Sequence, residues 1–155
     1  MVDYICQEIQ PDAILESTAD RCVLTYDERF LRRKVVTTSG GRSVLIDLPQ
    51  TTSLNDGDGL IVSDMIIGIV AASEDLFAVT GANLVQLAWH IGNRHTPCQI
   101  KVDQLRIQAD PVIRHMLEHL GATVTPICTA FTPEGGAYGH GRTQSHGHVA
   151  TAHDY

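Results

Sequence analysis

The chain has 155 residues, of which 43% are hydrophobic, and its 18 acidic and 11 basic side chains give a formal net charge of −7. This composition supports a packed core and excludes a wholly disordered chain. The acidic balance is the opposite of what binding to nucleic acid or to an anionic membrane requires, so neither is expected as a partner.

The first 70 residues have the pattern of a small all-β domain. Strands are predicted over three segments rich in β-branched or apolar residues, namely 22–26, 34–38 and 43–48. Gly40-Gly41 fits a tight hairpin turn between the last two of these, and 55–59 (Asn-Asp-Gly-Asp-Gly) is a second turn signal. The apolar stretch 60–72 predicts one or two more strands. We therefore expect residues 1–70 to form a β-rich N-terminal domain.

Strands and helices alternate in the next part of the chain. The predicted strands are 66–71, 76–80, 99–102, 105–108 and 122–127. One helix is predicted before the 99–102 strand and a second before the last strand. From the 76–80 strand onward, the β-α-β-β-α-β order is the split βαβ arrangement of ferredoxin-like domains, which we expect over residues 71–131. The expected fold class is therefore α+β.

Both predicted helices carry end signals. The first, 81–92, has Leu84, Leu87, Ala88 and Ile91 at helical spacing. Gly92 suits the C′ position just after its end. In the second, Asp110 can cap the N-terminus, Pro111 suits the first position and Gly121 can end the helix. Its expected apolar stripe is Ile113, Met116, Leu117 and Leu120.

Residues 132–155 are expected to form a flexible tail, because this segment has almost no branched aliphatic residue with which to build a core. It holds half of the eight histidines, namely His140, His146, His148 and His153. Imidazole binds borderline ions such as Ni(II), Cu(II) and Zn(II) near neutral pH. We favour metal binding over a tail that is only pH-sensitive.

Two more histidine arrangements lie in the predicted ferredoxin-like domain. His115 and His119 are four residues apart on the second helix, so both rings project from one face and can share one ion. Two solvated histidines are an equally good interpretation of this pair. His95 follows the end of the first helix, in Gly92-Asn93-Arg94-His95. Taken alone, a histidine in such a turn is more often a hydrogen-bonding group than a metal ligand.

The chain has the features of a reduced, cytoplasmic protein. Residues 1–10 lack the basic segment and apolar stretch of a signal peptide. The stretch 60–72 is shorter than the roughly 20 apolar residues that cross a bilayer. The four cysteines, Cys6, Cys22, Cys98 and Cys128, form no CxxC motif, so we expect free and mostly buried thiols.

Motifs of catalysis are missing from the sequence. It contains no GxSxG nucleophile elbow, no GxxxxGK[ST] phosphate loop and no HExxH zinc helix. No set of general base, nucleophile and oxyanion donor can be assembled from it. We therefore expect a binding protein rather than an enzyme.

Several motifs in a fixed order resemble those of the UreE family of urease accessory proteins. In the C-terminal part they are GNRH (92–95), LGATV (120–124) and FxPEGGAYG (131–139), with a histidine-bearing tail behind them. In the N-terminal part they are RRK (32–34), LxDLP (45–49) and LxDGD (54–58). The resemblance covers nearly the whole chain.

This resemblance implies a nickel metallochaperone that delivers Ni(II) for assembly of the urease active site, with Zn(II) or Cu(II) able to substitute. It implies a homodimer formed through the C-terminal domains, a β-domain that binds a client or peptide, and the urease GTPase and urease apoprotein complex as partners. His95 matches the family's metal ligand at the dimer interface. A tail histidine completes the site in some members, and His146 or His148 is the candidate here. A generic Ni, Zn or Cu storage protein and a protein-binding adaptor are the alternatives.

Overall fold

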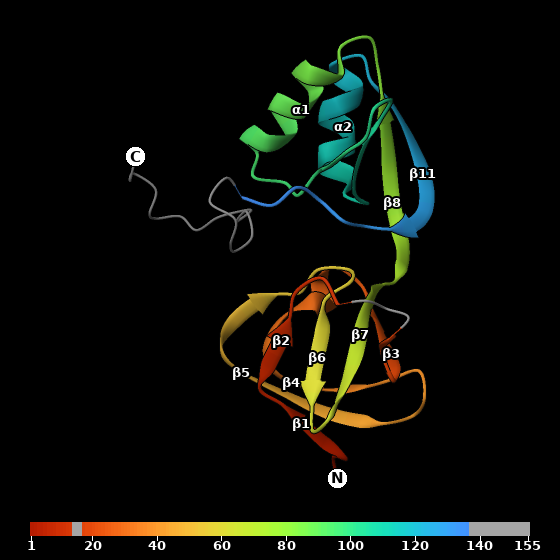
Figure 1. The fold of residues 1–155 in the computed structure, drawn as a ribbon. Helices are drawn as coiled ribbons and strands as arrows, with labels where there is room; N and C mark the ends of the chain where they lie inside the picture. The colour runs from red at the N-terminus through yellow and green to blue at the C-terminus, as the bar shows by residue number, and fades with distance from the viewer. Residues whose placement is uncertain (14–16, 137–155) are drawn as a thin grey trace. The chain divides into compact units, whose positions relative to one another are not determined.

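The computed structural model describes residues 1–13 and 17–136 of the chain. The chain divides into two compact units, Met1–Ala72 and Ser73–Tyr155, which are described separately below (Figure 1). In the part that is described, no helix is long and apolar enough to span a membrane.

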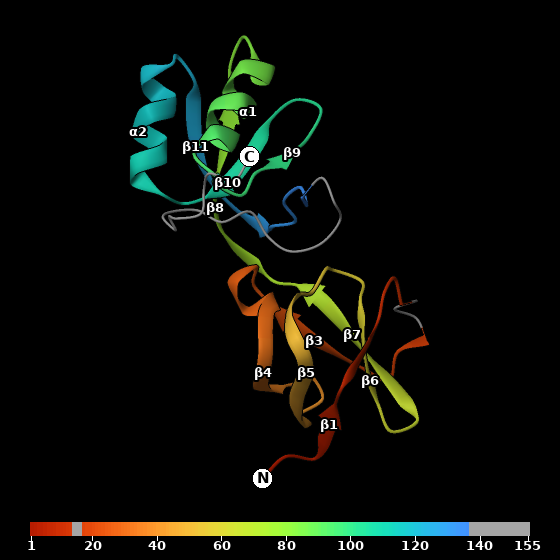
Figure 2. The ribbon, with the colours of Figure 1, turned by 90° about the vertical axis from the view of Figure 1, so that its left-hand side faces the viewer.

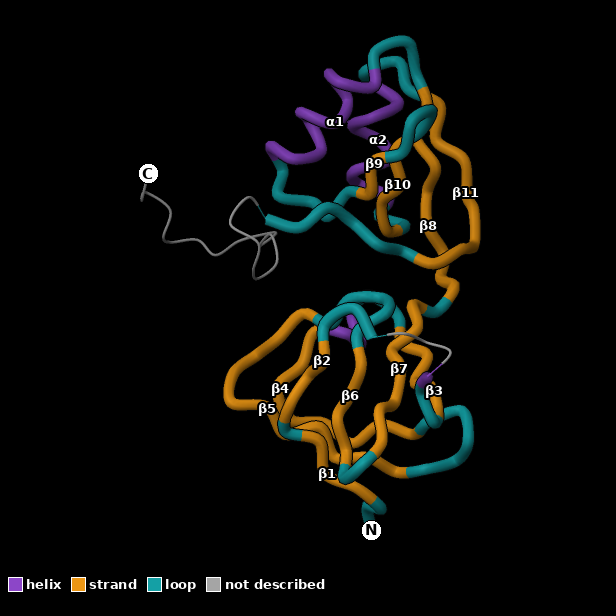
Figure 3. Tube along the Cα trace, viewed as in Figure 1, coloured by secondary structure: helices purple, strands orange, loops and turns teal. Residues whose placement is uncertain are grey.

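The first unit consists of two sheets (Figure 3). The four-stranded sheet has the order β2 (Glu8–Gln10), β6 (Gly59–Val62), β7 (Met65–Ala71) and β3 (Asp20–Leu24). The three-stranded sheet has the order β1 (Tyr4–Cys6), β5 (Ser43–Ser53) and β4 (Phe30–Thr37). A short 3-10 helix, η2 (Asp27–Arg29), precedes β4. Alternate residues of the strands point inward, so that Val44, Ile46 and Leu48 of β5 enter the core.

The predicted strands of this unit are present, and one detail differs. The apolar stretch 60–72 is the hairpin β6–β7, which turns at Ser63-Asp64, where Ser63 has a φ of 49°. The strands β4 and β5 do form an antiparallel hairpin. However, the turn expected at Gly40-Gly41 is a wider loop, closed where the Thr38 N–H donates to the Arg42 carbonyl at 2.9 Å.

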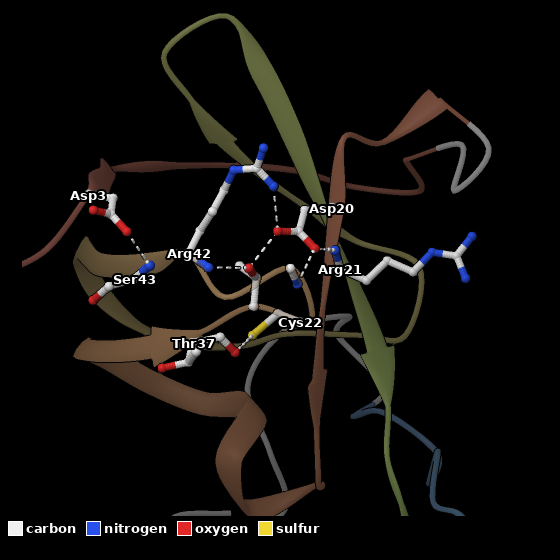
Figure 4. A network of polar contacts seen from close by, with 9 residues as sticks. Asp3, Asp20, Arg21, Cys22, Thr37, Arg42 and Ser43 are labelled. Atoms are coloured by element: carbon white, nitrogen blue, oxygen red, sulfur yellow. Dashed lines mark hydrogen bonds and ion pairs between the residues drawn. The ribbon is translucent and has the colours of Figure 1, made fainter.

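The buried carboxylate of Asp20 explains the wider loop (Figure 4). It accepts hydrogen bonds from Thr38 Oγ1 at 2.5 Å, Arg42 Nη1 at 2.7 Å and the Gly40 N–H at 3.0 Å. A Cβ on Gly40 would lie only 2.7 Å from Asp20 Oδ2, so glycine is needed there for close approach. The loop is thus shaped around a charge on another strand.

These contacts also lower the pKa of Asp20. Burial raises the pKa of this carboxyl, but the hydrogen bonds from Thr38, Arg42 and the N–H groups of Arg21 and Gly40 together outweigh it and hold the pKa at about 2. The folded pKa lies below the ordinary value of 3.8. The network therefore stabilises the fold above pH 3.8, and this contribution is lost as the pH falls toward 2.

None of the four cysteines forms a disulfide. Cys6 and Cys22 are buried in the core of the first unit, Cys98 is half-buried and Cys128 is exposed. Burial raises the pKa of Cys22 to about 11. The expectation of free thiols is confirmed, whereas that of mostly buried ones holds fully for only two of the four.

The second unit has the expected β-α-β-β-α-β order. Its elements are β8 (Ser73–Thr80), α1 (Leu84–Asn93), β9 (Gln99–Ile100), β10 (Leu105–Gln108), α2 (Pro111–His119) and β11 (Thr123–Ala130). The sheet has the order β11-β8-β10-β9 with all neighbours antiparallel, as in a ferredoxin-like fold. Both helices lie on one face of this sheet (Figure 2).

The helical stripes predicted from the sequence are the ones that pack. Leu87 and Ile91 of α1 and Ile113 and Leu117 of α2 are buried against the sheet. The other predicted members, Leu84, Ala88 and Met116, are partly buried and pack against the same core. One predicted member does not. Leu120, expected in the stripe of α2, is instead the C-cap residue and is exposed.

Substituting Asp20 with Ala should lower the free energy of unfolding by about 1–3 kcal/mol, because the Thr38, Arg42 and Gly40 donors lose their acceptor. Urea denaturation at pH 7 measures the change. Asp47→Ala is the matched control, since Asp47 pairs with Arg33 at 2.9 Å on a more exposed surface. Its loss should be below about 1 kcal/mol. Equal losses in the two variants would contradict the role given to Asp20.

Candidate metal centre

His95 occupies the position at which helix α1 ends. The helix continues to Asn93, with Arg94 as its C-cap, so Gly92 lies inside the last turn and not at the C′ position that the sequence predicted. The C′ residue is His95, whose φ of 58° lies in the left-handed region. Its side chain is exposed.

Backbone hydrogen bonds hold this residue in a Schellman motif. The Thr96 N–H donates to the Ile91 carbonyl at 3.3 Å, and the His95 N–H donates to the Gly92 carbonyl at 2.9 Å. These are the two bonds that define the motif, in which the C′ residue takes left-handed dihedral angles. His95 is therefore attached to a hydrogen-bonded helix end.

Helix α2 ends with the same motif but with a different residue at C′. The Ala122 N–H donates to the Leu117 carbonyl and the Gly121 N–H to the Glu118 carbonyl, both at 3.0 Å. Gly121 has a φ of 90°. Glycine adopts this conformation without a steric penalty, whereas an L-residue with a Cβ pays about 1–2 kcal/mol. The contrast marks His95 as a residue kept at a cost in stability, which is typical of functional positions.

An exposed apolar stripe on α1 leads to His95. Val85 and Trp89 are one turn apart and have exposed fractions of 82% and 63%. Gly92 continues the stripe, and a Cβ built there would meet no other atom within 4 Å. His90 beside it is half-buried, and its ring meets that of Trp89 edge-on at 5.1 Å between centroids. The surface next to His95 is thus apolar and open to close approach.

The segment Phe131–Gly136, which we call the strap, brings the start of the histidine-rich tail to the same place. Phe131 is completely buried. Beyond it, the Thr132 N–H donates to Gln99 Oε1 at 3.1 Å, and the Glu134 N–H donates to the Cys98 carbonyl at 2.9 Å. The strap therefore runs from edge strand β11 to Cys98 and Gln99 at the start of edge strand β9, and its anchor at Cys98 is three residues from His95.

The remaining predicted ligands fall in two groups. His140, His146, His148 and His153 lie outside the described residues. His115 and His119 are exposed on α2, away from His95 along the chain and in the fold. Within residues 1–13 and 17–136, no three His, Cys, Asp or Glu side chains are grouped so that they could hold a metal ion. Burial, with the nearby Glu134 charge, raises the pKa of Cys98 to about 11 and keeps it a thiol.

Comparisons with known proteins agree along the whole chain. Residues 4–72 match the family model of the UreE urease accessory protein N-terminal domain, and residues 74–155 match that of its C-terminal domain. The urease accessory protein UreE of Ruegeria pomeroyi is 51% identical over 144 residues, covering 92% of this chain and 97% of the relative. Those of Ruegeria sp. and Cereibacter sphaeroides are 57% and 53% identical over 129 residues each, covering 83% and 82% of this chain and 73% and 70% of the relatives.

Replacing His95 with Gly should raise the free energy of unfolding of the metal-free protein by about 0.5–1 kcal/mol. Relief of the left-handed strain outweighs the greater freedom of glycine in the unfolded chain. Urea denaturation in the presence of a chelator measures this change in the free energy of unfolding. His95→Ala should bring no gain, because alanine keeps the Cβ, and Gly121→Ala should cost about 1 kcal/mol at the matching position of α2. A destabilised His95→Gly variant would show that the ring itself supports the fold.

Proposed function

The chain belongs to the UreE family of urease accessory proteins, and we propose that it carries Ni(II) at a site built around His95. Its role is that of a nickel metallochaperone in urease maturation, and not that of an enzyme. The observation that carries the proposal is the exposed imidazole of His95 on a left-handed helix cap, a position that glycine usually occupies. Imidazole is a suitable ligand for nickel.

A second copy of the chain supplies the next ligand. The stripe of Val85, Trp89 and Gly92 ends at His95 and exposes large apolar side chains of the kind that protein interfaces cover. A twofold interface along this stripe places each residue of the stripe near the same residue of the other subunit. Two His95 rings then face one ion across the axis. We therefore assign the homodimer to the C-terminal unit.

Tail histidines complete the coordination, because two imidazoles leave nickel with open positions. The strap supports this step, since its hydrogen bonds to Cys98 and Gln99 fix where the tail begins. His140 follows Glu134 by six residues, which span at most about 20 Å. His146, His148 and His153 have longer reach, and His146 or His148 is our choice for the ligand.

A site of this kind suits delivery. Nitrogen ligands from a helix cap and a tail exchange one at a time, whereas a closed four-cysteine cage holds its ion firmly. Zn(II) and Cu(II) fit the same ligands, so the identity of the cargo comes from the urease client and not from affinity alone. We propose the urease GTPase and the urease apoprotein complex in the cytoplasm as receivers, with the β-rich unit binding the client. Family membership favours this role over a generic storage protein or an adaptor.

Loss of the His95 ring should abolish the tightest nickel site. In calorimetric titrations at pH 8, His95→Gly should lose that binding event, while gel filtration shows the same oligomer as the unmodified protein. Affinity of the unmodified protein should also fall between pH 8 and pH 6, because protons compete for imidazole. Unchanged tight binding by His95→Gly would refute the assignment of the site.

Charge on the α1 stripe should dissociate the dimer. Trp89→Asp places a carboxylate in the proposed interface, and we expect a monomer by light scattering, together with loss of the tightest nickel site. Val112→Asp is the matched control, because Val112 is equally exposed at 62% but lies on α2. It should leave both properties unchanged. A dimeric Trp89→Asp protein would place the subunit contact elsewhere.

Release of the strap should weaken nickel binding through the tail. Gln99→Ala removes the acceptor of the Thr132 N–H, a bond of about 1 kcal/mol, and the nickel affinity should fall about fivefold. The same substitution should have no effect in a chain truncated after Gly139, which lacks all four tail histidines, His140, His146, His148 and His153. Equal effects in the full and truncated chains would mean that Gln99 acts on His95 directly.

A further inference from the structure

A second pair of metal-binding side chains lies on α2, apart from the His95 site. His115 and His119 are both exposed and are separated by four residues within one continuous helix, Pro111–His119. Side chains at this spacing lie one above the other on the same face, so their imidazole rings can close on a single ion. With Glu118, the segment has the order His-x-x-Glu-His.

The sheet register places this pair at the opposite end of the helix layer from His95. Thr123 pairs with Thr80, so the end of α2 and the start of α1 lie at the same end of the sheet. The packing of Gly81 agrees, since a Cβ there would lie 3.7 Å from the Ala122 Cα. His95 lies beyond the far end of α1, and ten helical residues span about 15 Å. One ion therefore cannot bind to both groups of one protomer.

The charges around the pair favour a cation. Arg114, the nearest cationic side chain on the helix, is paired with Glu118 at 3.2 Å and lies over the Phe77 ring, 5.3 Å from its centroid. Its charge is thus compensated. His119 is the last residue of α2, where the carbonyl groups of the final turn carry partial negative charge.

We propose that His115 and His119 form a second binding site for a divalent transition-metal ion, with two imidazole nitrogens from α2 and water in the other positions. Because Arg114 holds the Glu118 carboxylate, the site binds metal without a general base for hydrolysis, unlike the zinc peptidase helices that share this residue order. The site is open to solvent and exchanges its ion readily. It does not rest on the assignment of His95.

The test is a titration of the full-length, ¹⁵N-labelled protein with Cu(II), which binds most tightly among the divalent ions that imidazole accepts. Paramagnetic broadening reports each occupied site separately. We expect amide signals of residues 112–122 to broaden in the unmodified protein and in His95→Ala. In His119→Ala and in His115→Ala, the Cu(II) concentration needed for that broadening should rise at least about tenfold, the smallest loss seen when even an outer partner of a metal is removed.

His90→Ala is the control, because His90 has no histidine four residues away on α1 and its loss should leave the α2 response unchanged. Spectra of the metal-free variants show that each is folded. Absence of broadening on α2 in the unmodified protein, or the same broadening in His119→Ala, would overturn the second site. Broadening on α2 that disappears in His95→Ala would overturn its independence, whereas failure of the His95 site alone leaves the α2 response in place.

Discussion

A left-handed backbone at one residue is the constraint on which the proposed metal centre depends. The Schellman bonds at the end of α1 fix the direction in which the chain leaves the helix, and they fix His95 at the point of departure. The next residues lead through Cys98 and Gln99, which hold the strap. His95, strand β9 and the strap are therefore positioned by one turn of backbone. A histidine in the middle of a helix would present its ring but would not redirect the chain.

The regular parts of this fold could be predicted because their signals are local. The stripes of α1 and α2, the Asp110 cap and the β-α-β-β-α-β order are all visible in the sequence and are confirmed by the structure. The three-residue strands β1 and β2 were missed, since so short a segment shows no alternation and forms only because a partner strand is present. The Asp20 network was missed for a related reason, because it joins residues far apart in the chain.

The end of α1 shows how a sound rule selects the wrong residue. Glycine is the usual residue after a helix, so the sequence predicts Gly92 at C′ and His95 in the turn beyond it. In the structure the helix extends through Gly92, and the left-handed position falls on His95. No sequence signal distinguishes these two outcomes. The resemblance to the family motif predicts that His95 is a ligand, and the dihedral angle shows that this residue occupies the left-handed helix cap.

The strap has a practical consequence for anyone who handles this protein. A peptide fused to a chain truncated after Gly136 follows Glu134 by two residues, and Glu134 is bonded to Cys98, three residues from the proposed nickel ligand His95. A polyhistidine purification handle placed there becomes a competing chelator at high local concentration, so measured stoichiometry would report the handle as well as the carrier. A handle without imidazole or thiol groups avoids this artefact.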